Sequence, residues 1–492
     1  MARTSVIHMT RVQAPDRLTS TMLLMLLTGC SLAPHYDRPA APVAATFASA
    51  GTATASSSMA RVAWQQFFTD PRLRRLLQLA LDNNRDAHIA MQRVEEARAL
   101  YGIRRADQLP GISAGLSATR MHLPTGMSIG GSDLDSTQYA VTLALSSWEL
   151  DFWGRVRNLK AAALESYLGE ADARRAVELS LIAQVANTYL LERDLDERID
   201  TARRTLATRD TTWHIMQRRY EVGSISRLDA SQARILRDQA RAELAALEQH
   251  RERAHNALVQ LVGVPLPDES VPLSAIETSF SADIGPGISS DVLLDRPDVQ
   301  AAEHRLKAAN ANIGVARAAF FPRITLFGGL GSSSSALDGL FGPNTQAWLF
   351  VPSLSQPLFD NGRNQASLDV AEARRNMAVA DYERTIQTAF REVADANADR
   401  HWLAQQVALQ QTMLADQNER VRLAQLRYQN GMSSFLEVLE AERAQFAVEQ
   451  MLVQTRRALL SGTVSLYAAL GGGSLSGQPA ASFNPPAGTD RQ

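Results

Sequence analysis

Three side chains near the C-terminal end of the chain have a spacing that allows them to act together. Leu436 and Glu440 are four positions apart, and Glu437 precedes Glu440 by three, so all three lie on one face of a helix. On the wall of a narrow passage, such carboxylates would favour cations and the leucine would repel water. On a solvated helix face, Glu440 would instead pair with Arg443. The residues alone leave both readings open, and the second is the simpler one.

The single cysteine, Cys30, is the next candidate. It follows positive charges at Arg11 and Arg17, the apolar run 22–27 and Thr28-Gly29. This order predicts a signal peptide, which is too short to span a membrane. The ending Leu27-Thr28-Gly29-Cys30 resembles a bacterial lipobox, in which the chain is cut before the cysteine and the thiol is acylated. We expect lipidation at Cys30; the alternative is an incidental or buried thiol. One cysteine allows no intrachain disulfide.

Other chemical motifs are weak. Ser113 lies in the string Gly-Ile-Ser-Ala-Gly, but this string starts a strand after Pro110, whereas a nucleophile elbow joins a strand to a helix. His250 and His255 are five positions apart, a poor spacing for one metal site on a helix. Lys+Arg 50 against Asp+Glu 52 argues against a nucleic-acid binder. We expect no enzyme activity, no cofactor and no metal.

The elements that must position these residues follow one order twice: helix, β-hairpin, long helix and return helix. Helical spacing alternates with strand-like period-2 spacing, and Pro110 and Pro322 mark the first change in each copy. The predicted ranges are Asp70–Gln108, Ile112–Leu123, Gln138–Glu149, Arg155–Tyr220 and Leu228–Val262, then Arg296–Phe320, Arg323–Ser332, Ala347–Leu358, a helix through Val379 and Val393 to the turn at Gly431, and a return helix to Leu470.

The two turns between long helices are the clearest sign of duplication. Gly223 and Gly431 are 208 positions apart, and the same offset relates Gly154 to Gly362 and Gly263 to Gly471. Glycine ends a helix in the left-handed conformation. Ser433 or Ser434 can cap the next helix, with Glu437 as the return partner of a capping box. Each turn is therefore predicted to be a helix-turn-helix tip.

These boundaries divide the chain into six predicted parts. They are a signal peptide (1–29), a lipidated tether (30–66), a first structural repeat (67–265), a linker (266–289), a second repeat (290–472) and a flexible tail (473–492).

The four predicted strands are long enough to cross a bilayer when tilted. Four strands in lipid would leave two edges unpaired, at several kcal/mol for each lost hydrogen bond. A membrane location would therefore require closure between subunits. From the residues alone, a soluble hairpin packed on the helices is equally possible. The helices have narrow apolar stripes, as in coiled-coil seams.

Several motifs in both halves resemble the TolC-type outer-membrane efflux channels, in particular their OprM-like lipoprotein branch. The motifs are Cys30-Ser-Leu-Ala-Pro, Leu150-Asp-Phe-Trp-Gly154-Arg155, Leu294-Asp-Arg-Pro297-Asp298, Ala318-Ala-Phe-Phe-Pro322, Leu358-Phe-Asp-Asn-Gly362-Arg363 and the two tips. The resemblance implies an α+β membrane protein. It also implies a homotrimer with one shared 12-stranded transmembrane β-barrel, four strands from each protomer, and a long coiled-coil α-barrel with an internal twofold repeat.

The resemblance further implies an exit duct of a tripartite efflux complex, located in the outer membrane with a large periplasmic portion and anchored in outer-membrane lipid at Cys30. A periplasmic adaptor protein and an inner-membrane pump would be its partners. A periplasmic coiled-coil structural or adaptor lipoprotein is the alternative function.

Site residues follow from the same resemblance. The adaptor-docking tips correspond to Val222, Gly223, Ser224, Asn430, Gly431 and Met432, and the periplasmic gate to Leu436, Glu437, Glu440, Asp229 and Tyr428. In this resemblance, Asp229 corresponds to an acidic gate residue of the first half, and Tyr428 corresponds to its tyrosine partner. The position of the archetype's locking arginine holds Ser433 here.

Overall fold

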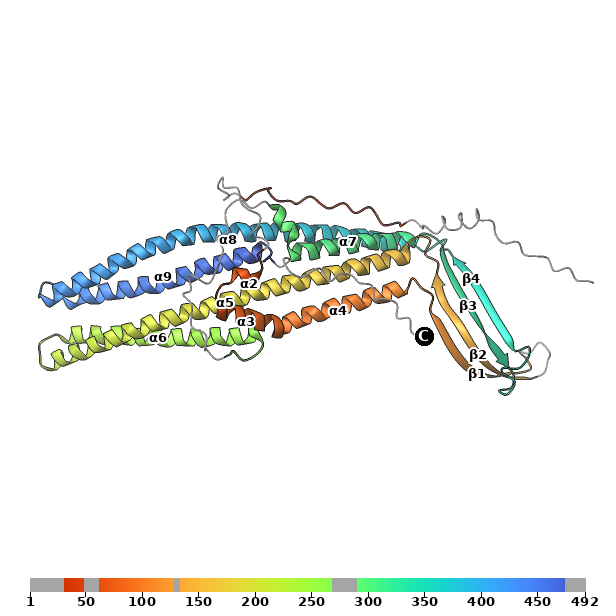
Figure 1. Ribbon diagram of the computed structural model, residues 1–492, viewed down its shortest axis with the longest axis horizontal. Coiled ribbons are helices and arrows are strands. Elements are labelled where there is room, and N and C mark those ends of the chain that lie inside the picture. The colour runs from red at the N-terminus through yellow and green to blue at the C-terminus, as the bar shows by residue number, and fades with distance from the viewer. Residues whose placement is uncertain (1–30, 48–61, 127–132, 268–289, 474–492) are drawn as a thin grey trace, which may run out of the picture. The chain divides into compact units, whose positions relative to one another are not determined.

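The computed structural model describes residues 31–47, 62–126, 133–267 and 290–473 (Figure 1). The predicted signal peptide, Cys30, most of the predicted linker and nearly all of the predicted tail lie outside these ranges. The elements, in chain order, are α2 (Trp64–Phe67), α3 (Pro71–Asn83), α4 (Arg85–Ala106), β1 (Ile112–Leu123), β2 (Leu134–Glu149), α5 (Arg155–Glu221), α6 (Arg227–Val262), η3 (Ser290–Asp295), α7 (Pro297–Ala318), β3 (Arg323–Ser334), β4 (Gln346–Ser355), α8 (Arg363–Gln429) and α9 (Phe435–Ala469).

These elements form two compact units. Of the described residues, the sheet unit comprises those up to Arg38, within Glu96–Leu168 and within His304–Ala380. The helix unit comprises the described residues within Pro39–Glu95, within Gly169–Glu303 and from Asp381 onward.

The sheet unit contains one antiparallel sheet with the order β1-β2-β3-β4 (Figure 1). Both predicted hairpins are confirmed, and β2 additionally pairs with β3, which joins the hairpins from the two halves. β2 begins at Leu134 and not at Gln138, and β4 ends at Ser355 and not at Leu358. A bulge between Leu145 and Trp148 shifts the β2–β3 register.

The two faces of this sheet differ in polarity. Side chains alternate between faces along a strand, and the register places Leu116, Val141, Ser332 and Gln346 in one row across the sheet. That face is mostly apolar; its members include Ile112, Leu116, Leu143, Leu330, Trp348, Phe350 and Leu354, all exposed in the single chain. The opposite face is rich in small and hydroxyl side chains, among them Ser113, Gly115, Ser117, Thr119, Thr142, Gly329, Ser333 and Ser353.

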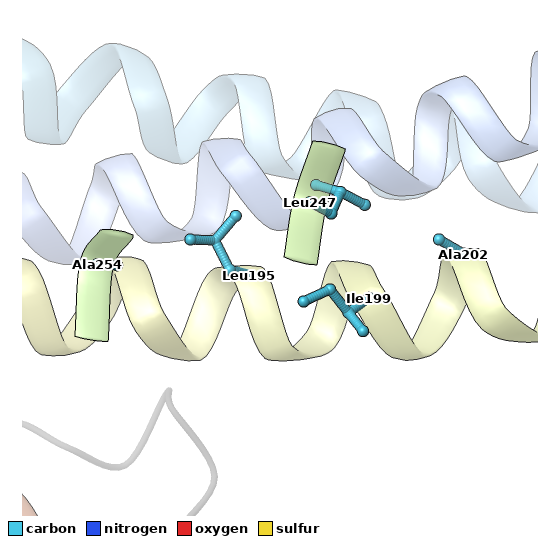
Figure 2. Packing of buried hydrophobic residues seen from close by; sticks show 5 residues of the cluster. All are labelled: Leu195, Ile199, Ala202, Leu247 and Ala254. Carbon is cyan, nitrogen blue, oxygen red and sulfur yellow. The ribbon is translucent and has the colours of Figure 1, made fainter. Parts of the chain in front are cut away.

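The helix unit is built on long antiparallel hairpins. α6 returns along α5, and Leu195, Ile199 and Ala202 of α5 pack with Leu247 and Ala254 of α6 in a buried cluster (Figure 2). Phe446 of α9 is packed against this cluster. α9 returns along α8 in the same manner, through a cluster of Val421, Ala424, Val438 and Ala441. No helix within the described ranges is both long enough and apolar enough to cross a bilayer.

Elements 208 residues apart in the sequence have the same structure. α5 and α8 both have 67 residues, and their first residues, Arg155 and Arg363, are 208 positions apart. The glycines of each offset pair share a left-handed backbone: φ is 73° and 80° at Gly154 and Gly362, 73° and 69° at Gly223 and Gly431, and 79° and 91° at Gly263 and Gly471. The duplicated sequence therefore folds twice into the same helix ends.

The predicted helix Asp70–Gln108 is wrong in its continuity, because Asn84 separates α3 from α4. The Asn84 side chain accepts hydrogen bonds from the backbone N–H groups of Asp86 and Ala87 and donates one to the carbonyl of Leu261 at the end of α6. Its side chain therefore caps α4 and ties the break to a distant helix, which local periodicity does not reveal.

Gly263 offers a test of this junction. A Cβ atom at Gly263 would lie 2.6 Å from the carbonyl oxygen of Asn83, whereas a Cβ atom at Gly223, with a similar φ, would meet nothing within 4 Å. Alanine at either site incurs about 1–2 kcal/mol of backbone strain, and only Gly263→Ala adds the clash. We expect Gly263→Ala to lower the midpoint of urea unfolding clearly more than Gly223→Ala. Equal losses would show that the α3–α6 contact does not depend on this glycine.

Candidate functional site

The first tip joins α5 to α6 through paired helix-ending hydrogen bonds. The backbone N–H of Ser224 donates to the carbonyl of Arg219 and that of Gly223 to the carbonyl of Tyr220, both at 2.9 Å. This is a Schellman end, with Gly223 in the left-handed region. Ser226 then caps α6 in a capping box with Asp229.

The second tip repeats the helix-ending hydrogen bonds of the first tip but not its capping box. Met432 N–H donates to the carbonyl of Arg427 at 2.9 Å, and Gly431 N–H donates to that of Tyr428 at 3.0 Å. Ser434 is the N-cap of α9, but its side chain forms no capping hydrogen bond. The predicted capping box with Glu437 is therefore wrong: the Glu437 carboxylate instead accepts from Arg427 Nη1 at 3.0 Å. A charged guanidinium is a stronger donor than a backbone amide.

The apex of each tip is open to solvent. Val222 is 72% exposed and Met432 is 70% exposed, and Gly223, Ser224, Asn430 and Gly431 are exposed as well. A Cβ atom at either glycine would meet no neighbour within 4 Å. The six residues predicted for docking therefore form two small surfaces that a partner could reach.

The predicted gate residues divide into those with partners and those without. Leu436 and Glu440 are exposed on the first turns of α9, and the alternative pair of Glu440 with Arg443 is not formed in the described part of the chain. Asp229 accepts hydrogen bonds from Ser226. The Tyr428 hydroxyl accepts one from Arg219 Nη1 at 3.0 Å. Within one chain, Asp229 and Tyr428 therefore do not bond to each other but to Ser226 and Arg219, respectively.

Two arginines that the sequence reasoning missed organise this region. Arg219 joins α5 to Tyr428 of α8, and Arg427 joins α8 to Glu437 of α9. They occupy equivalent positions, 208 residues apart, and each directly precedes a tyrosine. The repeated Arg-Tyr pair before each glycine turn was the signal that could have identified them.

A buried charge lies farther from the tips. Arg209 of α5 is buried, and its guanidinium carbon lies 5.5 Å from the centre of the Phe446 ring on α9. Burial lowers the pKa of Arg209, although the nearby Glu442 carboxylate acts in the opposite direction. Burial raises the pKa of Glu442 by more than the hydrogen bond from Gln425 and the charge of Arg209 lower it. Ionised Glu442 is therefore held at a cost.

The motifs that carry the family resemblance include helix ends and junctions. Buried Arg296 donates to the carbonyl of Ala469 at 2.8 Å and to the carboxylates of Asp298 and Glu392 at 2.7 and 2.9 Å. In the sheet unit, Trp153 donates to the carbonyl of Pro322 at 2.9 Å. The described residues contain no group of three or more potential metal ligands.

The segment that follows Cys30 is held against α5 and α7 in the sheet unit. Ser31 donates to Asn158 at 2.9 Å, and Asn310 donates to the carbonyl of Pro34 at 2.8 Å. A Cβ atom at Gly314 would lie 2.7 Å from the backbone nitrogen of Ala33, so the absence of a side chain there lets the segment approach α7.

Comparison with known proteins identifies this architecture. The sequence profile described as "Outer membrane efflux protein" matches residues 76–264 and 288–472, more than half of the chain. The chain belongs to the outer membrane efflux protein family. Outer membrane protein OprJ of Pseudomonas aeruginosa is 40% identical over 457 residues, 93% of this chain and 95% of OprJ. The toluene efflux pump outer membrane protein TtgF of Pseudomonas putida is 41% identical over 476 residues, 94% and 99% of the two chains.

Solved structures agree with this assignment. The open state of the MtrE outer membrane channel of Neisseria gonorrhoeae superposes with a TM-score of 0.83 at 37% identity, covering 91% of this chain and 99% of MtrE. The resemblance to TolC-type channels is thus confirmed, and the fold is the helix-rich fold of that channel family, with a small sheet. This outer membrane efflux protein serves as an exit duct in the outer membrane.

The raised pKa of Glu442 predicts how the free energy of unfolding depends on pH. Because the folded protein binds the Glu442 proton more tightly than the unfolded chain, stability is lost as the pH rises through the folded pKa. We expect Glu442→Gln to raise the free energy of unfolding at about pH 8 and to have little effect at about pH 4. Glu419→Gln is the control: a hydrogen bond from Arg422 lowers the pKa of exposed Glu419, so its loss gives no gain at high pH. Urea unfolding at both pH values measures the difference, and a Glu442→Gln protein that is less stable at pH 8 would contradict the assignment.

Proposed function

We propose that three copies of this chain form one duct through which drugs and other small toxic compounds leave the periplasm passively. Each protomer contributes four strands to a shared 12-stranded transmembrane barrel and its long helices to a periplasmic α-barrel. The observation that carries the proposal is the four-stranded sheet, which has one apolar face and two edge strands.

The edges of the sheet support a shared barrel. β1 and β4 each pair with a single strand, so each has one row of backbone groups without a strand partner in the described chain. In lipid, such groups are costly and only a closed barrel satisfies them. The apolar face then contacts lipid, and the face rich in serine, threonine and glycine lines an aqueous interior.

An unpartnered stripe on α8 supports the trimeric assembly of the helix unit. Trp402, Leu409, Met413 and Leu423 recur at spacings that keep them on one side of the helix, and all four are exposed in the single chain. An apolar stripe of this kind on a long polar helix is typical of a helix–helix contact. We assign it to the neighbouring protomer.

The anchored segment after Cys30 supports lipidation at that residue. Ser31 and the carbonyl of Pro34 are bonded to Asn158 and Asn310 in the unit that carries the sheet. An acyl chain on Cys30 would therefore be attached next to a fixed segment of the membrane-bearing unit, and would add its hydrophobic energy to that of the barrel.

The two tips suit docking of a periplasmic adaptor, which would link the duct to an inner-membrane pump. Each tip presents an apolar residue, Val222 or Met432, beside a glycine turn with free space around it. The role requires no catalysis, and we assign none and no cofactor.

The gate is proposed at the start of α9. Threefold symmetry would repeat Leu436, Glu437 and Glu440 as rings, in which the leucines disfavour water and the carboxylates favour cations. Ser433 cannot act as a charged lock, and we assign the closed state to Arg219 with Tyr428 and to Arg427 with Glu437. Asp229 supports the adjoining turn through Ser226.

The names of relatives indicate a substrate class. They include a toluene efflux protein (TtgF) and an antibiotic efflux protein (ArpC) of Pseudomonas putida. We propose small, largely apolar toxic compounds as substrates, with the choice among them made by the pump.

The α8 stripe can be tested by its charge tolerance. We expect Leu409→Glu to weaken the trimer, because a carboxylate would be buried at the subunit contact, at a cost of several kcal/mol. Gln411→Glu places the same charge two residues away on the other side of the helix and should leave the trimer intact. Heat stability of the trimer on gels reports both. A fully stable Leu409→Glu trimer would remove the stripe from the interface.

The gate can be tested by ion selectivity in planar bilayers. We expect Glu440→Gln to reduce the preference for cations by at least about fivefold, because one exposed charge contributes about 1 kcal/mol at short range and the proposed trimer would lose three. Glu437→Gln should also raise the frequency of opening, since it removes the ion pair with Arg427. Glu419→Gln, an exposed carboxylate bound to Arg422, is the control and should change neither value. Unaltered selectivity in Glu440→Gln would place the carboxylate ring elsewhere.

A further inference from the structure

The connection between β3 and β4 folds back over the apolar face of the sheet. We call residues 335–345 the flap. Ser333 N–H donates to the carbonyl of Thr345 at 2.8 Å, and the Ser332 hydroxyl donates to Thr345 Oγ1 at 2.6 Å. Leu340 in the flap is only 3% exposed, and its carbonyl oxygen is a second, alternative acceptor for the Ser332 hydroxyl. The flap is therefore held to the sheet by hydrogen bonds and by a buried leucine.

A groove of about 490 Å³ lies between the flap and the sheet. Its walls include Val141 and Leu143 of β2, Leu330 of β3, Trp348 of β4 and Phe341 of the flap. The register puts Leu143, Leu330 and Trp348 in one row across three strands, so the floor of the groove is a continuous apolar surface. The volume falls within the range of small-molecule sites, about 300–1,000 Å³.

The chemistry of the lining favours a hydrocarbon. None of the lining residues is charged. The hydroxyls of Ser332 and Thr345 already have hydrogen-bond partners, which leaves the Gln346 amide and the Trp348 indole N–H as the remaining polar side-chain groups of the lining. A ligand that needed ion pairs or several hydrogen bonds would lose those of water without replacement. An unbranched alkyl chain gains from burial of each methylene.

The position of the groove identifies the source of that chain. The groove opens on the same face as Trp348, which is 81% exposed, and this is the face assigned to lipid. The only charged residue of the flap is Asp338, which would repel a phosphate-rich head group and attract an ammonium group. We propose that the groove binds one acyl chain of a zwitterionic phospholipid, such as phosphatidylethanolamine. This inference depends on the proposed membrane-spanning sheet.

The experiment counts lipids that remain on the purified trimer. The full-length protein is reconstituted with phosphatidylethanolamine or, separately, with lipid A, and released lipid-bound trimers are weighed by native mass spectrometry. Leu143→Trp fills the groove, and Val141→Phe fills it from the same strand by a smaller change. Leu354→Trp is the matched control: Leu354 lies on the same apolar face but does not line the groove.

We expect up to one retained phosphatidylethanolamine per chain in the wild type and in Leu354→Trp, and about tenfold weaker retention in both filled variants, because two or more methylenes lose their burial. Retention in the filled variants equal to that of the wild type would overturn the proposal, as would preferential retention of lipid A.

Conductance of the same preparations distinguishes failure of the groove site from failure of the proposed duct. A conducting trimer that retains no lipid refutes the groove site alone. A chain that forms no conducting trimer in either lipid refutes the duct and, with it, the groove site.

Discussion

Backbone hydrogen bonding at the edges of β1 and β4 is the constraint on which the rest of the structure depends. Each of these strands has one strand neighbour within the chain, and lipid supplies no donors or acceptors for the other side. An exposed apolar sheet face and unpaired strand edges are each unfavourable in water. A barrel closed from several sheets in a membrane accommodates both features. In the proposed membrane location the sheet needs other copies, and the subunit contact proposed for the apolar stripe on α8 is the corresponding need in the helix unit.

The internal duplication builds the same helix-turn-helix arrangement twice. The two copies differ in the contacts of the acidic residue that follows each turn. The paired glycines at 223 and 431 have nearly the same φ, so both tips turn alike. After the turn they differ: Asp229 completes a capping box, whereas Glu437 binds Arg427. The first tip thus uses its acidic residue to stabilise its own helix, and the second uses it between two helices. A contact between helices can respond to their movement in a way that a local cap cannot.

Much of this fold could be predicted from the sequence because its signals are local. Period-2 alternation gave β1 its bounds, Ile112–Leu123, and glycine spacing located both tips. The features that the sequence did not predict depend on contacts between residues that are distant in the chain. The break at Asn84 depends on the carbonyl of Leu261, 177 positions away. Tyr428 is bound by Arg219, 209 positions away. Helical periodicity carries no information on either contact. The family resemblance could therefore name candidate gate residues but not their hydrogen bonds.

Polar groups buried between α5 and α9 fix how the two repeats face each other. Arg198 Nε donates to Gln450 Oε1 at 2.7 Å, and the Gln450 amide donates back to the carbonyl of Arg198 at 3.3 Å. The surrounding seam of leucine and alanine would fit several registers. A slip of one turn would separate Arg198 from Gln450, and leaving the buried Gln450 amide without a partner costs about 1–3 kcal/mol. Because Leu436, Glu437 and Glu440 lie on the same continuous helix as Gln450, this pairing also sets the height at which the proposed gate residues meet their copies.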